Sequence, residues 1–193
     1  MKNLFICCIL LLVTQILFAQ NSKLNEDLLN ACEIGNVEMV NKLLVSGADP
    51  NCKSEDGYYP LHLACKSVNS YEISKLLIKH GANVNQRSKG SRNSGLTPIY
   101  YAAWNADGLA TLKLLIENNA DYSKPIPPQY MFKGSNLLGF AASNLNGLEI
   151  ARYLISLEVN VNEKNRYSTP LSVAIVNNNS IEMIKLLLEN GAN

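Results

Sequence analysis

Two short sequence patterns alternate along this chain at a nearly constant spacing. The first is a leucine-rich run that ends in a small turn residue: LLVSGADPN (43–51), LLIKHGANVN (76–85), LLIENNADYS (114–123), YLISLEVNVN (153–162) and LLLENGAN (186–193). The position of Gly47 recurs at 81, 119, 158 and 191, so successive copies are 33 to 39 residues apart. A period in this range indicates small structural units stacked one on the next.

The second pattern has the features of a helix start. Its copies are YPLHLACK (59–66), TPIYYAAW (97–104), NLLGFAAS (136–143) and TPLSVAIV (169–176), with an altered first copy EDLLNACE (26–33). Thr97 and Thr169 can cap a helix through their hydroxyls, and the proline after each fits the first helical position. The turn residues Gly47, Gly81 and Gly191 can end a helix in the left-handed conformation. Each unit therefore predicts two helices, and only stacking can bury their apolar faces.

These patterns resemble the ankyrin repeat, whose motif is Thr-Pro-Leu-His-x-Ala-Ala, then Val-x-x-Leu-Leu-x-x-Gly-Ala, then Asn. The resemblance covers residues 25–193 and implies an all-α solenoid of about five helix-turn-helix repeats joined by hairpin loops. The expected repeats are 25–51, 52–85, 86–123, 124–162 and 163–193.

The first 19 residues differ from the rest of the chain. Residues 4–18 are mostly apolar, Lys2 precedes them and Ala19 follows them. This arrangement predicts a signal peptide (1–19) cleaved after Ala19, a short linker (20–24), and a periplasmic or secreted protein. The alternative is an uncleaved membrane anchor formed by residues 4–18. The N-terminus of the mature protein, Gln20 or Met1, separates the two.

Repeat 4 departs furthest from the pattern. Asn136 stands in place of Thr and can still cap a helix, whereas Gly139 inside the helix is expected to cost about 1 kcal/mol relative to Ala.

The loops 86–94 and 123–135 are longer than the family pattern, and the second carries Tyr130 and Phe132 on a proline-rich segment. The last helix, IEMIKLLLEN, shows little sign of a polar outer face, so either the sequence is truncated or something covers this end.

Residues that could carry chemistry are few. The two histidines, His62 and His80, are expected to be structural. No catalytic or phosphate-binding motif and no CxxC occurs, and the net charge of +1 argues against nucleic-acid binding. We therefore expect no enzymatic activity, cofactor, metal or small-molecule substrate. Cys32 and Cys65 are expected to be buried and unpaired, and Cys52 to be the exposed thiol.

The resemblance implies protein binding through the concave face of the first helices and the hairpin tips. Among the aromatic residues, Trp104 and Tyr58 are expected on this face, whereas Tyr101 and Phe140 are assigned to the core. Trp104 is the expected anchor for a partner, unless it packs on the 123–135 loop instead. The candidate binding residues are Tyr58, Lys66, Leu96, Trp104, Asn105, Ser143, Asn144, Tyr130 and Phe132.

The function implied by the resemblance is the recognition of another protein, whose identity the sequence does not give. Two variants remain open: an inhibitory or accessory subunit of a neighbouring exported enzyme, and a secreted effector directed at a host protein. A membrane contact is expected only if the signal segment is not cleaved.

Overall fold

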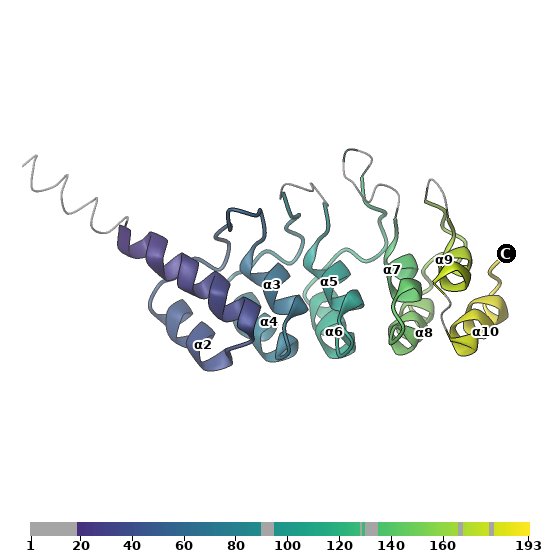
Figure 1. Ribbon diagram of the computed structural model, residues 1–193, viewed down its shortest axis with the longest axis horizontal. Helices are drawn as coiled ribbons and strands as arrows, with labels where there is room; N and C mark the ends of the chain where they lie inside the picture. The colour runs from purple at the N-terminus through teal and green to yellow at the C-terminus, as the bar shows by residue number, and fades with distance from the viewer. Residues whose placement is uncertain (1–18, 90–94, 128, 130–134, 166–167, 178–179) are drawn as a thin grey trace, which may run out of the picture.

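The computed structural model describes residues 19–89, 95–127, 129, 135–165, 168–177 and 180–193. In these residues the chain forms pairs of helices stacked in one row, and no strand is present (Figure 1). The first pair consists of a helix described over 19–34 and of α2 (Val37–Val45). The later pairs are α3 (Pro60–Lys66) with α4 (Ser70–Lys79), α5 (Pro98–Trp104) with α6 (Leu109–Glu117), α7 (Leu137–Ser143) with α8 (Leu148–Ser156), and α9 (Pro170–Val176) with α10 (Ile181–Glu189). The expected all-α solenoid is confirmed.

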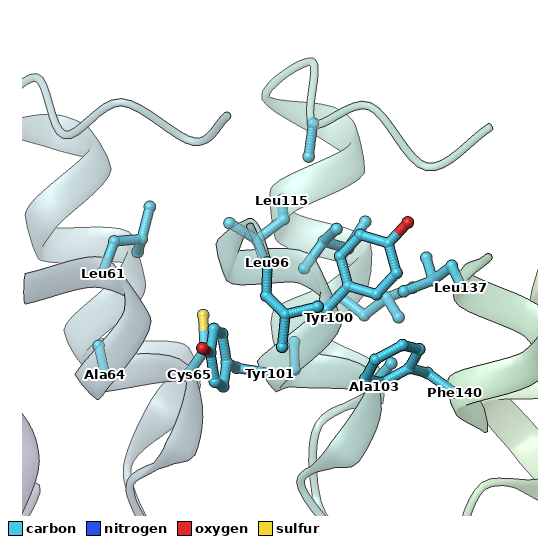
Figure 2. Packing of buried hydrophobic residues seen from close by; sticks show 14 of the residues in the cluster. Leu61, Ala64, Cys65, Leu96, Tyr100, Tyr101, Ala103, Leu115, Leu137 and Phe140 are labelled. Carbon is cyan, nitrogen blue, oxygen red and sulfur yellow. The ribbon is translucent and has the colours of Figure 1, made fainter. Parts of the chain in front are cut away.

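Two layers of helices run along the stack. The inner layer contains α3, α5, α7 and α9, each in contact with the next, and the outer layer contains α2, α4, α6, α8 and α10. Buried apolar side chains form one cluster that extends from Leu28 to Ala192. Figure 2 shows its centre, where Tyr100 and Phe140 meet between α5 and α7. Each helix pair is therefore stabilised by its neighbours, as expected for a repeat protein.

The helix starts follow the predicted chemistry with one exception. Asn136 accepts a hydrogen bond from the Gly139 amide at 2.6 Å, and Thr169 accepts one from the Ser172 amide at 3.3 Å. The expected cap at Thr97 is wrong: its hydroxyl is buried and has no partner among the described residues. The Tyr100 amide, which a capping hydroxyl would use, donates instead to the Thr97 carbonyl oxygen at 3.1 Å.

The predicted positions of the helix ends are confirmed by the backbone. The φ angle is positive at Gly47, Gly81 and Gly191, with values of 93°, 90° and 85°. It is also positive at the two equivalent positions that lack glycine, Asn119 (66°) and Glu158 (59°). All five repeats thus end their outer helix in the same way, although the left-handed conformation is unfavourable for a glutamate.

Asparagine side chains connect consecutive hairpin loops. The Asn51 amide group donates to the Gly81 carbonyl at 2.9 Å and accepts from the Asn83 amide at 2.8 Å. Asn85 and Asn162 make the same pair of bonds to the repeats that follow them. These bonds satisfy carbonyl groups at helix ends and fix the register of neighbouring repeats.

The N-terminal helix is longer than the sequence analysis expected. Residues 20–24, the expected linker, are helical, with Lys23 and Asp27 paired at 3.0 Å and Leu24 packed against the core. The expected signal peptide lies almost entirely outside the described residues. Within the described part of the chain, no helix combines the length and the apolar character needed to cross a membrane.

Candidate protein-binding face

Tyr58 and Lys66 lie together on the inner side of repeat 2. The Lys66 ammonium nitrogen is 5.0 Å from the centroid of the Tyr58 ring, close enough for a cation–π interaction. The Tyr58 ring contacts Tyr101 of the next repeat edge to face, with the two centroids 6.0 Å apart. Tyr58 is half-buried and Lys66 is exposed, so both predicted residues are accessible to a partner.

His62 supports this aromatic cluster from within. It is fully buried, its Nδ1 accepts from the Tyr59 amide at 3.3 Å, and its Nε2 lies 3.1 Å from the Leu96 carbonyl oxygen. Burial lowers the pKa of His62 to about 4, so the ring is neutral at pH 7 and donates from Nε2. The expected structural role of His62 agrees with this geometry.

Trp104 projects from the end of α5 and is 54% exposed. Its ring packs against Phe140 of the next repeat in a T-shaped arrangement, with ring centroids 5.8 Å apart and an interplanar angle of 88°. Tyr101 and Phe140 are buried, as predicted. The alternative in which Trp104 packs on the 123–135 loop stays a prediction, since most of the tip of that loop lies outside the described residues.

Three of the predicted binding residues have structural partners instead. Leu96 is 2% exposed, so its assignment to the binding surface is wrong: its side chain lies in the core between α3 and α5 (Figure 2). Asn105 donates to the carbonyls of Cys65 and Ser67, both at 3.0 Å. Asn144 donates to the Trp104 carbonyl at 3.2 Å. The two asparagines connect inner helices of neighbouring repeats.

The remaining candidates divide into two groups. The Ser143 hydroxyl donates to the Phe140 carbonyl at 2.8 Å, and the residue is half-buried at the edge of a pocket. Tyr130 and Phe132 lie outside the described residues, so their expected role in binding stays a prediction.

A pocket of about 200 Å³ lies beside Trp104 on the inner side of repeats 3 to 5. The pocket is lined by Trp104 of α5, by Gly139 and Phe140 of α7, and by Pro170 and Val173 of α9. Glu163 also lines this pocket, which we call the Trp104 pocket. Gly139, which was expected only to weaken its helix, is thus also part of the lining of this pocket.

A second depression of about 680 Å³ lies on the inner side of repeats 1 and 2, and we call it the N-terminal groove. Five acidic and two basic side chains line it. They are Glu26, Glu33, Asp49, Glu55 and Asp56, and Lys53 and Lys66. This acidic surface could not be predicted from the composition, because the nearly balanced charge of the whole chain hides a local excess of acidic residues.

The three described cysteines are all buried and unpaired, which confirms the prediction for Cys32 and Cys65. The prediction that Cys52 is exposed is wrong: it is 8% exposed, and its sulfur lies 3.7 Å from the Asn25 carbonyl oxygen of the long N-terminal helix. Burial raises the pKa of the Cys52 and Cys65 thiols to about 12. In the described residues, no group of three or more His, Cys, Asp or Glu side chains is arranged to hold a metal ion.

Similar proteins support the repeat assignment. A fowlpox virus protein named for its ankyrin repeats is 32% identical over 91 residues, which cover 47% of this chain and 15% of the viral protein. The human transient receptor potential cation channel subfamily A member 1 is 30% identical over 174 residues, 84% of this chain and 14% of the channel. Ankyrin repeat protein nuc-2 of Neurospora crassa is 36% identical over 104 residues, 52% of this chain and 9% of that protein.

The chain therefore spans only a small part of each relative. The sequence profile of the family described as ankyrin repeats (3 copies) matches residues 28–126 and again residues 127–193, together most of the chain. Because the profile matches over this length and the described residues form helix pairs stacked in one row, the chain belongs to the ankyrin repeat family.

Proposed function

We propose that this chain recognises another protein non-covalently through the inner face of α3, α5 and α7 and the adjoining hairpin bases. The observation that carries the proposal is the exposure of Trp104. A tryptophan side chain that is 54% exposed leaves a large apolar area in contact with water. Tryptophan is also among the residues most enriched at the energetic centres of protein interfaces.

The setting of Trp104 supports a binding role. The ring packs against Phe140, and this contact reduces the conformational entropy that Trp104 would lose when a partner covers its exposed part. The Trp104 pocket lies directly beside it, and Tyr58 and Lys66 extend the surface toward repeat 2. Ankyrin repeats as a family mediate protein–protein interactions, which is the general activity that the family membership supports.

The cellular setting is part of the proposal. The apolar segment 4–18 supports export, and the partner would then be a periplasmic or extracellular protein. An exported enzyme held by this chain, or a host protein contacted after secretion, would use the same surface. Sequencing of the N-terminus of the mature protein tests export: a start at Gln20 supports it, and a start at Met1 contradicts cleavage.

The binding role is tested with the Trp104→Ala variant. The tagged protein is cross-linked in its native cells, and the captured partner is identified and then titrated against purified variants. We expect Trp104→Ala to weaken the affinity by at least about tenfold, a typical loss at a central interface residue. The melting temperature should change little, because most of the side chain contacts solvent.

Tyr71→Ala is the matched control, since Tyr71 is an aromatic residue of outer helix α4 that is 37% exposed. It should leave the affinity unchanged. Equal binding by wild type and Trp104→Ala would contradict the proposal. A large loss of stability in Trp104→Ala would show that the tryptophan is part of the internal packing instead.

A further inference from the structure

The Trp104 pocket combines aromatic surface with a carboxylate. Trp104 and Phe140 form one side, Pro170 and Val173 supply aliphatic surface, and the charged residue among its described lining is Glu163. The Glu163 side chain is partly buried, and its main chain is fixed because its carbonyl accepts from the Asn136 side-chain amide at 3.0 Å. The loss of solvation raises the pKa of the Glu163 carboxyl.

This combination favours one kind of side chain over the others. An aliphatic side chain would bury the carboxylate further without a partner, which is costly. An acidic side chain would be repelled by it. A guanidinium group can stack on an aromatic ring and pair with a carboxylate at the same time, and its three methylenes can pack on Pro170 and Val173.

The charge of the N-terminal groove agrees with the same ligand. Its acidic residues outnumber its basic residues by five to two, on the same inner side of the stack as the Trp104 pocket. Stacked helices are about 10 Å apart, so the two depressions, some two repeats apart, are roughly 20 Å from each other. An extended peptide covers that distance with about six residues.

We propose that the partner contributes an extended basic segment, with one arginine in the Trp104 pocket and further basic residues over the N-terminal groove. This inference rests on the proposed function and specifies the chemistry of the partner. The arginine stacks on Trp104 and pairs with Glu163, and the acidic groove holds the rest of the segment by charge complementarity.

Synthetic peptides of about ten residues test the proposal, with arginine alternating with glycine or serine. Trp104 is the single tryptophan of the chain, so its fluorescence reports directly on the pocket. In one set of control peptides, citrulline replaces a single arginine at a time, because citrulline has the shape of arginine without its charge. In another control peptide, leucine replaces every arginine. We expect the arginine peptide to change the emission of Trp104, and one of the citrulline peptides to bind about tenfold more weakly.

The variant Glu163→Gln completes a double-mutant cycle. The preference for arginine over citrulline should disappear in Glu163→Gln and should be retained in Glu117→Gln, which makes the same charge change at an exposed position of outer helix α6. Affinities are measured by calorimetry at low and high salt, and the salt dependence should be weaker in Glu163→Gln.

Three outcomes would overturn the inference. The leucine peptide could bind as tightly as the arginine peptide, the arginine preference could survive in Glu163→Gln, or no basic peptide could bind. If Trp104→Ala still lowers the affinity for the partner captured by cross-linking in any of these cases, the proposed function stands. Only the assignment of an arginine to the Trp104 pocket then fails.

Discussion

The imidazole of His62 and the backbone carbonyl of Leu96 are joined by a hydrogen bond of 3.1 Å that connects repeat 2 with the hairpin of repeat 3. This bond needs a proton on Nε2, and the fully buried ring also accepts from the Tyr59 amide at Nδ1, which requires the neutral form of the histidine. Protonation would put a charge in the core and would replace the acceptor that the Tyr59 amide needs. The stability of the stack is therefore linked to the protonation of one side chain.

The first prediction concerns pH. Burial lowers the pKa of His62 to about 4, whereas an unfolded histidine titrates near 6.5. Between these values the unfolded chain binds a proton that the folded chain does not, so the free energy of unfolding should fall by roughly 3 kcal/mol as the pH drops from 6.5 to 4. Urea titrations across this range measure it. His62→Gln should be less stable at pH 7 and should have a shallower pH dependence, while exposed His80→Gln should retain the wild-type slope.

The second prediction concerns two equivalent threonines. Among the described residues the buried hydroxyl of Thr97 has no hydrogen-bond partner, whereas the hydroxyl of Thr169 accepts from the Ser172 amide. Thr97→Val should raise the free energy of unfolding by about 1 kcal/mol, because it removes an unsatisfied polar group. Thr169→Val should lower it by about 1 kcal/mol through loss of the cap. Thermal unfolding of the two variants measures both effects, and a loss of stability in Thr97→Val would show that its hydroxyl has a partner after all.

The third prediction concerns the ends of the outer helices. Glu158 has a φ of 59°, a left-handed conformation that costs an L-residue roughly 1–2 kcal/mol. Glu158→Gly should stabilise the protein by about 1 kcal/mol, or about 3 °C in melting temperature. Asn119→Gly is the matched comparison: asparagine tolerates the same conformation, so the gain there should be smaller. Equal gains at both positions would contradict strain at Glu158.

The fourth prediction concerns the interface between repeats 3 and 4. Ser123 occupies the position of Asn51 and Asn85, but its amide and hydroxyl contact the Asp121 carboxylate of its own loop. Ser123→Asn places an amide where it can reach the Glu158 carbonyl and the Asn160 amide, the equivalents of the partners of Asn51. We expect a gain of about 1 kcal/mol.

The converse change, Asn51→Ser, should remove the two bonds that Asn51 makes to Gly81 and Asn83 of repeat 2, and it should destabilise the protein. Hydrogen exchange of repeats 4 and 5 measures the coupling across the interface. Slower exchange in both repeats is expected for Ser123→Asn, and unchanged exchange would show that the asparagine bonds do not couple the repeats.

Much of the fold could be predicted because its determinants are local. Pro60, Pro98 and Pro170 each begin a helix, and the five equivalent turn positions all have positive φ, even where the residue is Asn119 or Glu158. Proline and left-handed turn positions act within a few residues, so their spacing in the sequence places the helices directly.

The candidate site was predicted only in part. Trp104, Tyr58 and Lys66 are accessible on the inner face, whereas Leu96 is buried and Cys52 is covered by the N-terminal helix. The Trp104 pocket could not be predicted, because the residues that line it come from three repeats and meet only in the folded stack.

The sequence by itself determined the register of the repeats, the identity of the helices and the positions of their ends. Only the tertiary structure decided which polar side chains bind the neighbouring repeat and which remain free for a partner. The environment of Thr97, Asn105 or Glu163 depends on what the adjacent repeat presents at close range, and residues distant in sequence supply that surface only once the stack has formed.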